Sequence, residues 1–222
     1  MPNAVPLPPT TPASSAPRAL LERGLDTSSG LGFVRDRLAL LSKTLFFVSF
    51  AFYLFLLASM VLVGGAPFVA VVRGPIALGH LLASLTMAVL WLLTTQTRPT
   101  LERLGALDVI SFVLAGVFLS HMTIREEGQI LQVLLALMVT VMLRAILLPS
   151  RPGRTLLLSA LVFLPTIVVC TARHHPTAFL PGFSPAYQKL QMTLNTVLWS
   201  ILGVTLATVA SRTLYGLRQQ VA

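Results

Sequence analysis

Charged residues are scarce in this chain. Only 10% of its 222 residues are Asp, Glu, Lys or Arg, against about 25% in an average soluble domain. A soluble protein of this size could not cover its apolar side chains with so few charges, because its surface must face water. Hydrophobic residues make up 55% of the chain, and the mean hydropathy is +0.83. These values predict an all-α protein that crosses a membrane several times.

Acidic residues and cysteine are also rare. Seven Asp and Glu stand against sixteen Lys and Arg, which gives a net charge of +9. The basic residues are scattered between apolar runs, so we expect no nucleic-acid partner and interpret them as topology signals. The single cysteine, Cys170, excludes an intrachain disulfide and a cysteine metal cluster.

Motifs for catalysis are missing. The sequence contains no glycine-rich phosphate loop, GxSxG turn or HExxH pair, which are the common signatures of phosphate binding, acyl transfer and zinc hydrolysis. It also lacks a long acidic loop that could hold Mg²⁺ beside a phosphate. We therefore expect no cofactor and no catalytic residue within these 222 residues.

Long runs free of charge are what the sequence does contain. A helix needs about 20 apolar residues to cross a bilayer. Six windows predict a bundle of six transmembrane helices within residues 44–212, at about 44–63, 76–95, 107–122, 129–148, 155–171 and 190–212. The third and fourth windows are short, so we expect Asp108 at the end of span three and Arg144 near one end of span four.

The segments around the spans differ from them in composition. Residues 1–30 are rich in Pro, Ala and Ser, which predicts a disordered cytoplasmic tail. Residues 31–43 alternate basic and apolar side chains, as in an amphipathic interfacial lead-in. A Gly64-Gly65 turn should follow span one, residues 172–189 should form a long outer loop, and residues 213–222 should begin a cytoplasmic linker helix.

The distribution of basic residues predicts the orientation. Six spans place both chain ends on one side, and that side would hold twelve of the sixteen basic residues: Arg18, Arg23, Arg35, Arg37, Lys43, Arg98, Arg103, Arg144, Arg151, Arg154, Arg212 and Arg218. An excess of Lys and Arg marks the cytoplasmic side, so both termini should be cytoplasmic, in a bacterial inner membrane. Arg144 could then snorkel from the inner boundary to the headgroups, and Asp108 could cap its helix there. The alternative is a transport or ion-pair role, since charges inside a membrane are candidates for function.

Histidines gather at the predicted outer face, together with two glutamates: His80, His121, His174, His175, Glu126 and Glu127. Imidazole and carboxylate groups bind metal ions, and histidine titrates near neutral pH. A metal or proton sensor is one interpretation. The other is that these are hydrated residues at helix ends, since no HxxxH or HxH spacing is present.

Small residues recur at a spacing of four in the last span, at Gly203, Ala207 and Ser211. This spacing lets helix backbones approach closely in lipid. It is consistent with packing inside one bundle or with the seam of a homodimer.

The C-terminal stretch reads Ser-Arg-Thr-Leu-Tyr-Gly-Leu-Arg over residues 211–218. It resembles the junction in myxobacterial-type membrane-bound serine/threonine protein kinases, where a multi-span N-terminal region ends in a similar helix before a linker and a kinase domain. The Pro-rich tail and the six spans fit the same pattern. The kinase motifs themselves are absent from this chain, so no catalytic residue is carried over. The helix reaches Ala222 with no Gly or Pro stop, which suggests a fragment of a longer product.

The resemblance implies a membrane anchor and sensor region, in which the last span relays an outer-face stimulus to a cytoplasmic kinase domain if the gene continues. Two alternatives stay open: a small channel or transporter, and a structural membrane protein with no ligand. A transporter needs polar groups at the midplane, and these spans offer few. Flux measured in proteoliposomes would distinguish it. The lipid bilayer is a partner in every case.

Overall fold

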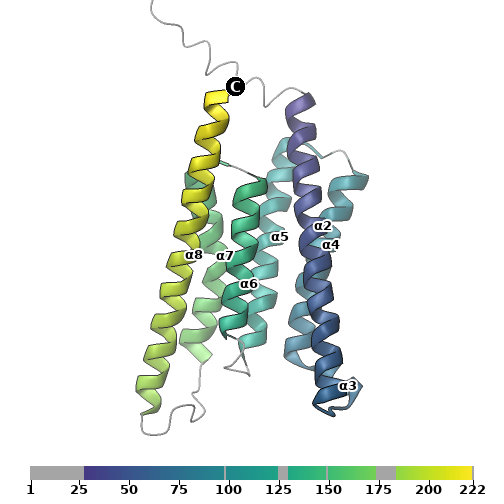
Figure 1. The fold of residues 1–222 in the computed structure, drawn as a ribbon, viewed down its shortest axis with the longest axis vertical. Coiled ribbons are helices and arrows are strands. Elements are labelled where there is room, and N and C mark those ends of the chain that lie inside the picture. Colours follow the sequence, from purple (N-terminus) through teal and green to yellow (C-terminus); the bar gives the residue numbers. More distant parts are fainter. Residues whose placement is uncertain (1–27, 98, 125–129, 149, 174–183, 222) are drawn as a thin grey trace, which may run out of the picture.

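The computed structural model describes residues 28–97, 99–124, 130–148, 150–173 and 184–221, and nearly all of these residues are helical (Figure 1). In order they are α2 (Ser28–Ala58), the π-helical turn η1 (Ser59–Val63), α3 (Phe68–Arg73), α4 (Pro75–Gln96), α5 (Leu101–His121), the 3₁₀ turn η2 (Met122–Ile124), α6 (Ile130–Leu147), α7 (Pro152–Arg173) and α8 (Pro185–Val221). These ranges contain no β-strand.

The surface of the bundle is apolar. Six helices (α2 with η1, then α4 to α8) are long and apolar enough to cross a membrane. Large side chains such as Phe55, Leu131 and Leu198 are more than 60% exposed. In water, an exposed apolar surface of this extent would cause aggregation. In a lipid bilayer it contacts apolar acyl chains, and each spanning helix satisfies its own backbone hydrogen bonds. The chain is a multi-pass membrane protein, and the predicted all-α bundle of six transmembrane helices is confirmed.

The helices alternate in direction, so the first described residues of α2 and the last of α8 lie at the same end of the bundle (Figure 1). We call this the terminal end and assign to it residues 28–43, 91–97, 99–108, 144–148, 150–155 and 208–221. Around the bundle, α4 packs between α2 and α5, α7 packs between α5 and α8, and α6 packs mainly on α8.

Three helices begin five or more residues earlier than predicted, namely α2, α5 and α8. The start of α8 at Pro185 lies within the predicted outer loop 172–189, so residues 185–189 are helical. The predicted interfacial segment 31–43 is part of α2, because Leu38 and Leu41 are buried against the other helices. Span three starts at Leu101, where the Thr100 hydroxyl accepts a hydrogen bond from the backbone N–H of Arg103. Asp108 therefore lies two turns inside α5 and not at its end.

Other connections agree with the sequence or lie outside the described residues. Gly65 has a φ of +64°, the left-handed conformation that glycine adopts without strain, and so completes the predicted turn. The short helix α3 was not predicted. The tail up to residue 27 and residues 174–183 of the outer loop lie outside the described ranges.

Glycines let α5 approach its neighbours closely. A Cβ atom at Gly79 of α4 would lie 2.6 Å from the carbonyl oxygen of Phe118, and one at Gly116 of α5 would lie 2.6 Å from the carbonyl oxygen of Val162. One turn beyond Gly116, Ser120 Oγ lies 2.6 Å from Thr166 Oγ1 of α7. Close backbone contacts and hydrogen bonds between hydroxyl groups both favour the association of helices in lipid. They hold α5, which carries Asp108, in a defined position.

Candidate functional site

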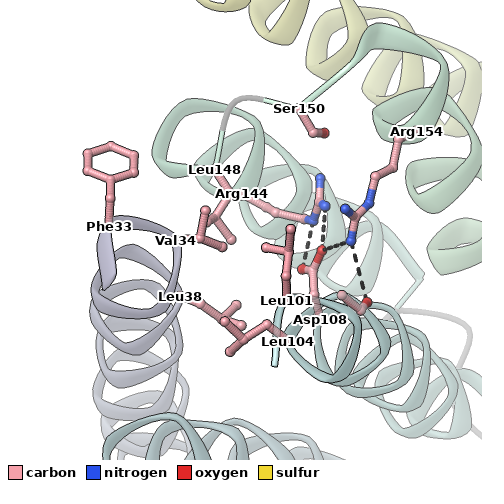
Figure 2. A pocket seen from close by; sticks show the side chains of 11 residues that line it. Phe33, Val34, Leu38, Leu101, Leu104, Asp108, Arg144, Leu148, Ser150 and Arg154 are labelled. Atoms are coloured by element: carbon pink, nitrogen blue, oxygen red, sulfur yellow. Dashed lines mark hydrogen bonds and ion pairs between the residues drawn. The ribbon is translucent and has the colours of Figure 1, made fainter. Parts of the chain in front are cut away.

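A buried ion pair joins α5 to α6 at the terminal end. Arg144 Nε donates to Asp108 Oδ1 at 3.0 Å, and Arg144 Nη2 donates to Asp108 Oδ2 at 2.5 Å (Figure 2). The two side chains are only 4% and 6% exposed. A bidentate guanidinium–carboxylate pair is the strongest form of such a contact. Each charge costs several kcal/mol to desolvate, so each depends on the other.

A second guanidinium, from the first turn of α7, reaches the same carboxylate. Arg154 Nη2 lies 3.3 Å from Asp108 Oδ2 and 3.4 Å from the carbonyl oxygen of Gly105 (Figure 2). Gly105 allows this approach, because a Cβ there would lie 3.3 Å from Arg154 Nη2. The Arg154 side chain is 48% exposed. Two positive charges thus share one negative charge.

A cavity of about 210 Å³ lies beside these three side chains. One wall is polar and contains Asp108, Arg144, Arg154 and Ser150. The rest is apolar, lined by Phe33, Val34, Leu38, Leu101, Leu104 and Leu148. In Figure 2, Val34 and Leu38 extend from α2 toward the helices that carry the charged groups. At about 30 Å³ per water molecule, the cavity has room for roughly seven waters. It can accept a small charged group together with an apolar portion.

A ring of hydroxyl groups connects this cavity to α8. Ser150 Oγ lies 2.8 Å from Thr155 Oγ1, Thr155 Oγ1 donates to Ser211 Oγ at 2.9 Å, and Ser211 Oγ donates to the carbonyl oxygen of Ser150 at 2.8 Å. Each hydroxyl has one proton, so Ser150 donates to Thr155. The ring ties α8 to the junction of α6 and α7.

The small-residue stripe of α8 faces the rest of the same chain. Ala207 and Ser211 are fully buried. A Cβ at Gly203 would lie 2.7 Å from Phe163 Cζ and 3.0 Å from Met138 Cγ. Of the two predicted arrangements, the structure therefore contains packing within one bundle, and the stripe is covered by α6 and α7.

Two of the predicted outer-face residues, His80 and His121, lie at the opposite end of the bundle. His80 Nδ1 is 3.3 Å from Met122 Sδ, and His121 is exposed at the end of α5. Glu126, Glu127, His174 and His175 lie outside the described residues. Within the described ranges, no three His, Cys, Asp or Glu side chains come together. The metal or proton sensor stays a prediction.

Sequence reasoning named Asp108 and Arg144 but preferred snorkelling and helix capping to an ion-pair role, and it missed Arg154 as a site residue. Arg144 does not snorkel, because its guanidinium is buried on Asp108. The sequence did contain a signal for this pair. Spans three and four are consecutive and antiparallel, so Asp108 and Arg144 are expected at the same depth in the membrane.

No protein-family model, curated protein or solved structure matches this chain.

Proposed function

We propose that this chain is the membrane anchor and relay region of a bacterial signalling protein, of the serine/threonine kinase type that its C-terminal residues resemble. In this proposal a stimulus at the outer face shifts the bundle, and α8 passes the shift to a cytoplasmic output domain. Multi-span anchoring alone is the competing function.

The observation that carries the proposal is the length and attachment of α8. The helix runs for 37 residues without a break, about 55 Å at about 1.5 Å per residue. A hydrocarbon core is only about 30 Å thick. A continuous helix of this length can carry a rotation or a displacement from inside the membrane to a domain outside it.

The hydroxyl ring supplies the point at which the bundle could act on α8. Ser211 is fully buried and bonds to both Ser150 and Thr155. A movement at the start of α7 would therefore displace α8 beside its exit from the bundle. Signalling requires two arrangements of this junction, with their balance set by the stimulus.

The distribution of basic residues supports one orientation of the bundle. Among the described residues, the terminal end carries nine Lys and Arg, whereas the opposite end carries three (Arg73, Arg173 and Lys189). Basic residues are retained in the cytoplasm, so this bias supports a cytoplasmic terminal end and an output domain on that side.

The test joins the full chain to a serine/threonine kinase domain after Ala222, through zero to four added Ala residues. If α8 transmits rotation, autophosphorylation should vary with linker length at the period of a helix, about 3.6 residues. Ser211→Ala should change autophosphorylation severalfold, because it releases α8 from the junction.

Thr213→Ala is the matched control. Thr213 is exposed, and its hydroxyl bonds only to the carbonyl oxygen of Val209 in the same helix. Equal kinase activity in all linker lengths and in both variants would leave anchoring as the function.

A further inference from the structure

We propose that the cavity beside Asp108, Arg144 and Arg154 binds an anionic group of the phosphate class, with an adjoining apolar portion against α2. Such a group is offered by an anionic phospholipid or by free phosphate. The site does not depend on whether α8 carries a signal.

The charges around the cavity favour an anion. Asp108 is the only acidic side chain among the lining residues, and two guanidinium groups face it. Both donate to the same atom, Asp108 Oδ2. The two like charges are therefore held close together with one carboxylate between them. A second anion would neutralise the remaining positive charge.

Donors remain for such an anion. Arg144 uses Nε and Nη2 on Asp108, and Arg154 uses only Nη2, on Asp108 and Gly105. In the part of the chain that the structure describes, Arg144 Nη1 and Arg154 Nε and Nη1 have no hydrogen-bond partner. Guanidinium groups bind phosphate oxygens through paired N–H donors.

The surroundings of the cavity suit the headgroup of an amphiphile. Its apolar lining side chains are aliphatic or aromatic and come from α2, α5 and Leu148, which directly follows α6. Apolar walls exclude water and strengthen each charge interaction. Arg154 is half-exposed, so the positive wall remains accessible. A volume of about 210 Å³ accommodates a phosphate and its nearest carbons, while acyl chains would lie along the exposed apolar faces outside.

The experiment uses the full chain in a neutral maltoside detergent. Three probes are titrated separately: phosphatidylglycerol, phosphatidylcholine with the same acyl chains, and sodium phosphate at constant ionic strength. Thermal unfolding is followed by circular dichroism, because a ligand that binds the folded state raises the midpoint by an amount that grows with the logarithm of its free concentration divided by its Kd. We expect phosphatidylglycerol to raise the midpoint and phosphatidylcholine to leave it unchanged.

Three variants test whether the anion binds at this cavity. Arg154→Gln should weaken the apparent affinity tenfold or more, the usual effect of losing a charge-assisted contact. Arg212→Gln is the matched control, since Arg212 is an exposed cation at the same end that does not line the cavity. Val34→Phe adds bulk to the apolar wall without removing a charge, and should also abolish binding. It provides the test if Arg154→Gln does not fold.

The outcomes separate the sources of the anion. If sodium phosphate without added lipid raises the unfolding midpoint in the same Arg154-dependent way, the ligand is a free anion. If only phosphatidylglycerol does, the ligand is a lipid. The proposal is overturned if neither anion raises the midpoint, if phosphatidylcholine acts as well as phosphatidylglycerol, or if Arg154→Gln and Val34→Phe both titrate like the wild type.

Discussion

Removing the carboxylate of the buried ion pair should be among the most damaging single changes in the bundle. Asp108→Leu leaves the Arg144 guanidinium, with its side chain only 4% exposed, without the two acceptor oxygens it binds. Arg154 can turn outward to water because half of its side chain is exposed. Arg144 cannot do so without leaving the interface of α5 and α6.

The expected size follows from the burial of the pair. Breaking a buried ion pair by removing one partner costs about 3–5 kcal/mol. Replacing both partners by apolar residues is often neutral, because no charge then needs to be desolvated. Asp108→Leu with Arg144→Met should therefore recover most of the loss. For a chain of this size, about 3–5 kcal/mol corresponds to a fall of roughly 6–20 °C in the unfolding midpoint.

Thermal unfolding in detergent, followed by circular dichroism, measures both variants. Glu102→Leu is the control, since Glu102 is an exposed carboxylate in the first turn of the same helix and should change the midpoint little. Equal unfolding midpoints for Asp108→Leu and Glu102→Leu would show that Arg144 does not depend on the Asp108 carboxylate. A double variant, Asp108→Leu with Arg144→Met, that is no more stable than Asp108→Leu alone would contradict the same conclusion.

Two further predictions concern packing and orientation. Gly116→Ala should cost about 1–3 kcal/mol, because the new Cβ would lie 2.6 Å from the carbonyl oxygen of Val162 and force α5 from α7. Gly153→Ala in α7 has open space around it and should be neutral or slightly stabilising; equal midpoints for the two variants would contradict the close helix contact. Reporter tags at the two chain ends should both be cytoplasmic, because the terminal end carries the excess of Lys and Arg. Tags on opposite faces would refute the six-span topology, and two outer tags would refute the orientation.

The number of membrane-spanning helices and much of their extent could be read from the sequence, whereas the short helix α3 could not. The span predicted at 76–95 is found as Pro75–Gln96, and the one predicted at 129–148 as Ile130–Leu147. Lipid explains this success, since it supplies no hydrogen-bond partner for the backbone and requires a helix of fixed apolar length. The least accurate boundaries were those set at a charged residue.

The candidate site shows why the helix end predicted at Asp108 was wrong. Windows free of charge treat each ionised residue as a helix end, which holds when the charge must reach water. Asp108 breaks this rule because its partners, Arg144 and Arg154, lie 36 and 46 residues further along the chain. Their pairing depends on which helices become neighbours, and no local pattern contains that information.

The sequence by itself determined a bundle of six membrane-spanning helices, because hydropathy and helix length are local properties that a bilayer selects directly. Only the tertiary structure decided that two arginines meet one aspartate beside a cavity, and that Ser211 ties α8 to the junction of α6 and α7. Those features depend on glycine contacts and on helix order around the bundle, which set the distances between residues far apart in the chain.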